Sequence, residues 1–262
     1  MDFTTSDGVR IAYDDLGPRD GVPVVLCHGL GAAGEQMHAD AAFLAAQGYR
    51  VLVRDVRGHG RSGKPTPMMP EGFSIERMAE DQIAMLDHAA AGPVHWVGNS
   101  LGGIVALQML DGHEHRFRTL ATYGTSYALN LPPWTAGALP LVYRVFGAPL
   151  AGRLTGKTTT RNKDAQPLIA KLITAFDPEV GRLAAGQVSR YDLIGNAVAA
   201  TLPILMARGK LDRAVNSALG STLAAMQARA NFTLVELPTG GHCANLDATD
   251  ELRAALLAFW GR

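Results

Sequence analysis

Residues 98–102, Gly-Asn-Ser-Leu-Gly, contain a serine between two glycines in the pattern Gly-x-Ser-x-Gly. The apolar run 93–97 precedes them and a helix-like segment, 104–110, follows. A strand, a tight turn and a helix in this order form a nucleophile elbow, in which the turn exposes the serine hydroxyl at the rim of a sheet. The glycines let neighbouring backbone pass close by. The pattern predicts that Ser100 is a nucleophile; a glycine-rich turn with an incidental serine is the alternative.

A serine hydroxyl is a poor nucleophile unless a base takes its proton and an acid orients that base. Asp212 follows the apolar, strand-like segment 203–207, and His242 follows two glycines in the loop before the last helix-like segment. This order, Ser, Asp, His, is the one that the elbow motif requires. Asp192 is a weaker candidate for the acid, because it falls in a segment that interrupts the strand and helix alternation.

A reaction at a carbonyl also needs fixed donors for the oxyanion that develops. The backbone N–H of Leu101, directly after the nucleophile, is one predicted donor. The second is the N–H of Leu30, in the loop that follows the strand-like segment 23–27. His28 lies in the same loop, and we expect it to hold the loop by hydrogen bonds rather than to act as a base.

A third loop, residues 55–62, also follows a strand-like segment. We interpret its Asp55 and Arg57 as structural. Histidines from three loops could in principle bind a metal, but they lack the spacing typical of such sites, so we expect no metal and no cofactor. These histidines are His28, His59 and His242.

The elements that must position these residues alternate between strand and helix patterns, which predicts an α/β fold with a mostly parallel sheet covered on both faces. The expected strands are residues 9–13, 23–27, 49–54, 93–97, 118–123, 203–207 and 232–237. The expected helices are 35–47, a segment that Ser74 caps and that runs to residue 90, 104–110, 215–229 and 250–260.

Residues 127–200 break the alternation and predict an inserted helical lid, which divides the core domain into 1–126 and 201–262. Helices are expected at 167–176 and 180–188. Ordinary helical packing on the main layer is the alternative. Some apolar residues of this segment either line a substrate pocket or pack within the lid, chiefly Trp134, Tyr143 and Phe146. Its cations either attract an acidic substrate or form a solvated face: Arg144, Arg153, Lys157, Arg161 and Lys163.

The composition narrows the classes of partner. The 262 residues are 47% hydrophobic and 18% charged, and 24 Lys and Arg balance 24 Asp and Glu, which favours a packed core and gives no reason to expect nucleic acid or a membrane as partner. There is neither an apolar run of the roughly 18–20 residues that span a bilayer nor a signal-peptide pattern, so we expect a cytoplasmic protein. Only Cys27 and Cys243 are present, so a disulfide framework is not expected. Both cysteines adjoin predicted site histidines, where oxidation or alkylation could block the site.

Taken together, these motifs resemble the α/β-hydrolase superfamily. The matching pieces are His28-Gly29, residues 55–62, residues 98–103, Asp212 and Gly241-His242. The resemblance implies an eight-stranded sheet, a helical cap between strands six and seven, and a triad of Ser100, Asp212 and His242. Within the superfamily, segments 73–81 and 241–247 are similar to the 3-oxoadipate enol-lactonases and related esterases.

We therefore expect a serine hydrolase that cleaves a small-molecule carboxylic ester or lactone through an acyl-enzyme intermediate. One alternative is a carbon–carbon bond hydrolase of the meta-cleavage type: Asn99 is like those enzymes, but their Gly-Pro-Gly after the first His-Gly is missing. Another is a ligand-binding receptor that retains the triad. A dehalogenase is disfavoured, because it would need a carboxylate at position 100. The sequence leaves open whether the chain forms a homo-oligomer.

Overall fold

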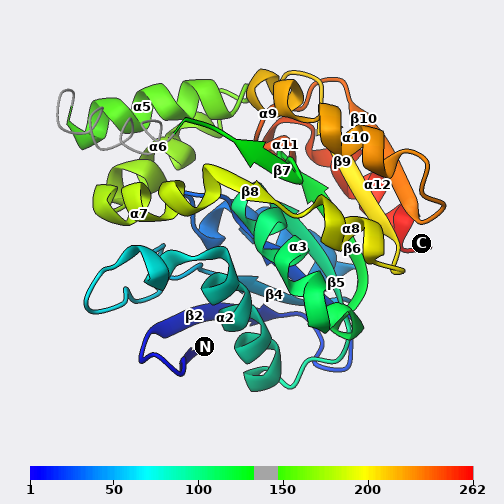
Figure 1. Ribbon diagram of the computed structural model, residues 1–262, viewed down its shortest axis with the longest axis horizontal. Coiled ribbons are helices and arrows are strands. Elements are labelled where there is room, and N and C mark those ends of the chain that lie inside the picture. The colour runs from blue at the N-terminus through cyan, green and yellow to red at the C-terminus, as the bar shows by residue number, and fades with distance from the viewer. Residues whose placement is uncertain (133–146, 262) are drawn as a thin grey trace.

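A computed structural model, which describes residues 1–132 and 147–261, contains an eight-stranded sheet between layers of helices (Figure 1). The strand order is β1-β2-β4-β3-β5-β6-β9-β10, and the pairs from β4 to β10 are all parallel. Within this sheet of the described chain, the pairs β1–β2 and β2–β4 are antiparallel. The predicted fold class is thus confirmed. The strands are β1 (Asp2–Thr4), β2 (Arg10–Leu16), β3 (Pro23–Cys27), β4 (Arg50–Arg54), β5 (Val94–Asn99), β6 (Phe117–Tyr123), β9 (Ile204–Gly209) and β10 (Phe232–Leu237).

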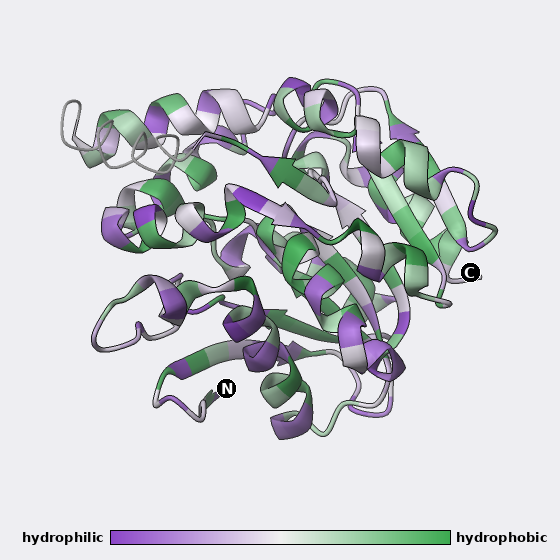
Figure 2. Ribbon diagram, viewed as in Figure 1, coloured by the Kyte–Doolittle hydropathy of each residue, from purple (hydrophilic) through white to green (hydrophobic). Residues whose placement is uncertain are grey.

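Helices cover both faces of the sheet, because its central strands are apolar on both sides. Figure 2 shows the hydrophobic residues gathered on the strands and on the helix sides that face them. One buried cluster joins the sheet to α2 (Ile75–His88), α3 (Leu101–His113), α8 (Ile194–Ala199) and α10 (Gly220–Met226). A second cluster joins the other face to α1 (His38–Ala46) and α12 (Thr249–Phe259).

Two helix predictions differ in detail from the structure. Segment 35–47 is a 3₁₀ turn, Gly34–Met37, followed by α1. The single helix expected at 215–229 is two helices, α9 (Arg213–Ala218) and α10, and the break falls at Leu219, directly before Gly220, where a glycine makes a continuous helix less favourable. The cap at Ser74 is confirmed, since its hydroxyl accepts a hydrogen bond from the Arg77 N–H at 3.1 Å.

Within residues 127–200 the structure describes β7 (Ala128–Asn130), α5 (Ala148–Thr159), α6 (Gln166–Ala175), α7 (Pro178–Val188), β8 (Arg190–Asp192) and α8. Strands β7 and β8 form a separate antiparallel pair. Helices α5 and α6 pack against each other at the upper left of Figure 1. Helix α8 instead packs on α3, and its Ala197 is buried in the core. The division into core and lid therefore stays a prediction.

No helix was expected at residues 148–159, because the segment from Pro132 to Gly152 is rich in Pro and Gly. Two glycines have a packing role in helix α5: an added Cβ on Gly152 would lie 2.5 Å from the Ala170 carbonyl oxygen, and one on Gly156 2.8 Å from that of Gln166. The predicted pocket residues Trp134, Tyr143 and Phe146, and Arg144, lie outside the described residues. No helix in the described parts of the chain is long and apolar enough to cross a membrane.

Candidate active site

The turn between β5 and α3 has the backbone of a nucleophile elbow. Ser100 has φ 49° and ψ −113°, a conformation that is strained for a residue with a Cβ. Its N–H donates to the Tyr123 carbonyl oxygen at 3.0 Å, which ties the turn to the neighbouring strand β6. The strain is maintained by packing on all sides, and the serine side chain is left half-buried at the sheet edge.

The glycines of the elbow are required by close backbone contacts, as the sequence predicted. An added Cβ on Gly98 would lie 2.5 Å from the Gly102 carbonyl carbon. An added Cβ on Gly102 would lie 2.3 Å from the Cys27 carbonyl oxygen, on strand β3. Any side chain at either position would therefore push the helix and the sheet apart.

Asp212 and His242, which are 30 residues apart in the sequence, form a hydrogen bond at the same edge of the sheet. The His242 Nδ1 lies 2.9 Å from the Asp212 Oδ2, and the Asp212 Oδ1 accepts from the Val215 N–H at 3.2 Å. An ionised carboxylate only accepts hydrogen bonds, so Nδ1 carries the proton and Nε2 is the ring's acceptor. The rival acid Asp192 lies in β8, where its Oδ1 accepts from the Ile194 N–H.

The Ser100 hydroxyl has no hydrogen-bond partner among residues 1–132 and 147–261. Hydrogen bonds between nucleophile and base are often long or misaligned before substrate binds, so this geometry does not exclude His242 as the base. The role of the three residues as a triad stays a prediction.

The two predicted oxyanion donors have no partner within the described protein. The N–H groups of Leu30 and Leu101 donate to no group in the described chain, and Leu101 is the first residue of α3, whose N-terminus favours negative charge. Next to Leu30, an added Cβ on Gly29 would lie 3.2 Å from the Ser100 Cβ. The arrangement can hold an oxyanion, and this assignment also stays a prediction.

His28 holds its loop, as expected. Its Nδ1–H donates to the Gly29 carbonyl oxygen at 2.8 Å and its Nε2 accepts from the Val56 N–H at 3.1 Å. Burial lowers its pKa to about 4, and that of the neighbouring His59 to about 3. Both rings are therefore neutral near pH 7, and neither is a candidate base.

A buried chain of amides links the elbow to the histidine loop, and the sequence analysis missed it. The Gln36 Nε2 donates to the Asn99 Oδ1 at 3.1 Å and to the Asn245 Oδ1 at 3.2 Å. The Asn99 Nδ2 donates to the His242 carbonyl oxygen at 3.0 Å. The only signal was position: Asn99 directly precedes Ser100, and Asn245 lies three residues after His242. Gln36 had none.

A cavity of about 140 Å³ lies beside His242. Its residues come from the oxyanion loop, the amide chain, α5 and α6: Gly29, Leu30, Gly31, Ala32, Gln36, Asn99, Thr155, Thr159, Ile169, Leu172, Ile173, His242 and Cys243. The basic groove of about 490 Å³ that Arg153, Lys157 and Lys163 line shares no residue with it. These three cations of the predicted lid therefore line a groove separate from the cavity.

The two cysteines are both buried, and only Cys243 lines the cavity. Burial raises the pKa of the Cys27 thiol to about 11 and that of Cys243 well above its ordinary value. Because the thiolate is the reactive form, both are poor targets for alkylation.

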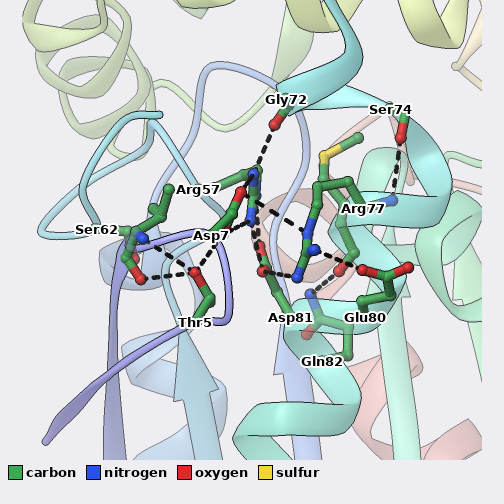
Figure 3. A network of polar contacts seen from close by, with 12 residues as sticks. Thr5, Asp7, Arg57, Ser62, Gly72, Ser74, Arg77, Glu80, Asp81 and Gln82 are labelled. Atoms are coloured by element: carbon green, nitrogen blue, oxygen red, sulfur yellow. Dashed lines mark hydrogen bonds and ion pairs between the residues drawn. The ribbon is translucent and has the colours of Figure 1, made fainter. Parts of the chain in front are cut away.

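The loop of residues 55–62 has the structural role expected of it (Figure 3). The fully buried Arg57 donates to Asp81 through Nε at 2.6 Å and Nη2 at 2.7 Å, and also to Asp7 and to the Gly72 carbonyl oxygen. Asp55 accepts from the Gly34 N–H and from Arg61. No group of three or more His, Cys, Asp and Glu side chains in the described chain could hold a metal ion.

Asp247, in the helix α11 (Ala244–Asp247), joins the histidine loop to the end of α5. Its Oδ2 accepts from the Gly241 N–H at 2.9 Å. Its Oδ1 accepts from the Thr160 hydroxyl, from the Arg161 N–H at 2.8 Å and from the Asn162 N–H at 3.0 Å. One carboxylate thus fixes the base of the α5–α6 pair next to His242.

Comparison with known proteins places this geometry in context. The profile of a family described as serine aminopeptidase, S33, matches residues 21–248. The magnesium-chelatase 30 kDa subunit of Rhodobacter capsulatus is 30% identical over 263 aligned residues, which cover 93% of this chain and 88% of the relative. A non-heme chloroperoxidase of Streptomyces lividans is 42% identical over 101 residues, 38% of this chain and 35% of the relative. In this relative and in two others, the aligned region covers about a third of the relative's length.

Among solved structures, the enol-lactonase from Burkholderia xenovorans LB400 is similar to this chain with a TM-score of 0.85 at 22% identity. The match covers 97% of each chain. At this identity the likeness shows a shared fold, that of the α/β-hydrolases.

Proposed function

Since this chain belongs to the serine aminopeptidase S33 family and has the α/β-hydrolase fold, we propose that it hydrolyses carboxylic esters or lactones through Ser100, His242 and Asp212. The observation that carries the proposal is the strained elbow: Ser100 is held at φ 49° beside two backbone N–H groups that are free in the described chain. The enol-lactonase activity of the similar structure supports the choice of substrate class.

The geometry supports a two-step reaction without a cofactor. His242 Nε2 takes the proton of Ser100 as the hydroxyl oxygen attacks the carbonyl carbon, and Asp212, held at 2.9 Å, stabilises the imidazolium. The N–H groups of Leu30 and Leu101 bind the oxyanion. The leaving oxygen receives the proton from His242, and an acyl-enzyme remains on Ser100. Water then gives a proton to His242 and attacks the acyl carbon. As the acyl carbon separates from Ser100, His242 returns that proton to the serine oxygen and the acid is released.

The test compares Ser100→Ala with the wild type on p-nitrophenyl acetate and butyrate and on γ-butyrolactone. Turnover in the variant should fall by about 10³-fold or more, because no covalent intermediate can form. Labelling by a serine-reactive fluorophosphonate should disappear. Ser217→Ala is the matched control, since Ser217 is exposed and its hydroxyl bonds only within its own helix. Wild-type rates in Ser100→Ala would overturn the proposal.

The same panel separates the alternatives. Turnover of a vinylogous diketone without turnover of the esters would favour a carbon–carbon bond hydrolase. A single slow turnover with retained product would favour a receptor.

A further inference from the structure

The cavity beside His242 is small. Its volume of about 140 Å³ is close to that of an engineered protein cavity of roughly 150 Å³ that binds benzene. A group of about six heavy atoms therefore fills it. Because the cavity lies between the oxyanion loop and α6, it receives the part of a substrate next to the carbonyl that Ser100 would attack.

One wall of the cavity is apolar and the other is polar. Leu30 and three residues of α6 and its C-terminal end form the apolar wall: Ile169, Leu172 and Ile173. The polar wall consists of Gln36, Thr155 and Thr159. The two threonines are four residues apart on α5, so they lie on one face of the helix, one turn apart.

The threonines at the end of α5 differ in whether their hydroxyl groups have hydrogen-bond partners. Thr158, which is exposed, donates to the carbonyl oxygens of Leu154 at 3.2 Å and Thr155 at 3.1 Å, and Thr160 donates to Asp247. The hydroxyls of Thr155 and Thr159, the two that line the cavity, have no partner among the described residues. A helical threonine can bond to the preceding turn, as Thr158 does, so the helix itself does not forbid such bonds.

Gln36, which also lines the cavity, has an unsatisfied acceptor of its own. Its side chain is 1% exposed, and its Oε1 has no donor in the described chain. The orientation of this amide is fixed, because its Nε2 points at two acceptors, the side-chain oxygens of Asn99 and Asn245. The amide orientations of these two asparagines are fixed in the same way. The Asn99 Nδ2 donates to the His242 carbonyl oxygen, and the Asn245 Nδ2 donates to Asp40. The polar wall thus has hydrogen-bonding capacity that the protein does not use.

We propose that this cavity is an acyl pocket for short, polar acyl groups, and that Thr155 and Thr159 select a hydroxyl or oxo substituent near the scissile carbonyl. The inference rests on the proposed ester or lactone hydrolysis. An apolar acyl group of the same length would leave both hydroxyls unpaired in a closed site, whereas a hydroxyacyl group replaces the water that they lose.

The experiment uses a matched substrate pair, p-nitrophenyl 3-hydroxybutyrate and p-nitrophenyl butyrate, which differ by one hydroxyl. Each kcat/KM is divided by the spontaneous hydrolysis rate of that ester. The wild type should prefer the hydroxy ester by about tenfold, the effect of one to two hydrogen bonds. Thr155→Val and Thr159→Val, which keep the side-chain shape, should each reduce the preference severalfold. p-Nitrophenyl decanoate should be a poor substrate.

Two control variants make the result specific. Thr155→Ser keeps the hydroxyl and should keep the preference, which guards against a general effect of substitution or misfolding. Thr158→Val, on the exposed face of the same helix, should leave the ratio unchanged. Equal use of both esters by the wild type, or a preference that survives both valine variants, would overturn the inference alone. Failure to hydrolyse any ester would instead count against the proposed function.

Discussion

The Arg57 network and the α5–α6 pair are held in different ways. Arg57 is fully buried, and charged or carbonyl partners from three separate segments bind it (Figure 3). Helices α5 and α6 pack on each other through Gly152 and Gly156, and their outer face is exposed and basic. The first region holds the loop of residues 55–62, in which the Val56 N–H donates to His28 of the oxyanion loop. The second contributes the cavity wall and is joined to the histidine loop through Asp247.

The largest expected effect comes from removing the carboxylate of Asp81, the buried partner of Arg57. Asp81→Ala leaves the buried Arg57 without its bidentate partner and should lower the free energy of unfolding by about 3–5 kcal/mol. Glu80→Ala is the control, because the exposed Glu80–Arg77 pair should contribute at most about 1 kcal/mol. Urea denaturation measures both. Equal losses in the two variants would mean that burial of the ion pair is unimportant.

Acid should weaken the core more than the α5–α6 pair. Burial lowers the pKa values of His28 and His59 to about 4 and about 3, while in the unfolded chain they titrate near 6.5. Between the folded and unfolded pKa values, the unfolded state binds more protons than the folded state. The contribution of the two neutral histidines to stability is therefore fully present above pH 6.5 and decreases as the pH is lowered. Each histidine should remove about 2 kcal/mol between pH 6.5 and 5.

Urea denaturation at pH 7, 6 and 5 measures this loss. Residues 148–175 contain no histidine, so the helix pair has no such acid response of its own. His59→Asn should reduce the slope by about one proton, and His115→Asn, at an exposed position, is the control. A stability that is constant over this range would contradict the prediction.

The smallest expected effect is at Asp247, which joins the histidine loop to the α5–α6 pair. Asp247→Asn keeps the size of the side chain but removes one of the acceptor oxygens that serve Gly241 and residues 160–162. We expect a loss of about 1 kcal/mol in global stability and faster proteolysis near residues 160–162. Asp250→Asn, at an exposed position of α12, is the control. Unchanged proteolysis would mean that Asp247 does not hold the helix pair.

The core was predictable from sequence because its signals are local. The apolar runs of β3 and β5 and the glycines around Ser100 identify strands and a turn within a few residues of each other. Asp212 and His242 could be predicted because the fold brings the carboxyl ends of parallel strands to one edge. By contrast, Gln36, Asn245 and Thr155 act only through partners far away in the sequence. Helix α5 was missed because its glycines serve contacts with α6, and a single segment cannot show such contacts.

The four hydrogen bonds to Asp247 also set a rule for engineering. The carboxylate belongs to the segment that follows His242, whereas three of its donors lie in consecutive residues just after α5. A foreign helical hairpin grafted in place of α5 and α6 would have to keep these donors, and also the packing of Ala151, Ile169 and Ile173 on Cys243. The graft would need a hydroxyl at position 160 and free N–H groups at positions 161 and 162. With these three donors kept, α5 and α6 form a unit whose replacement would change the residues that line the cavity.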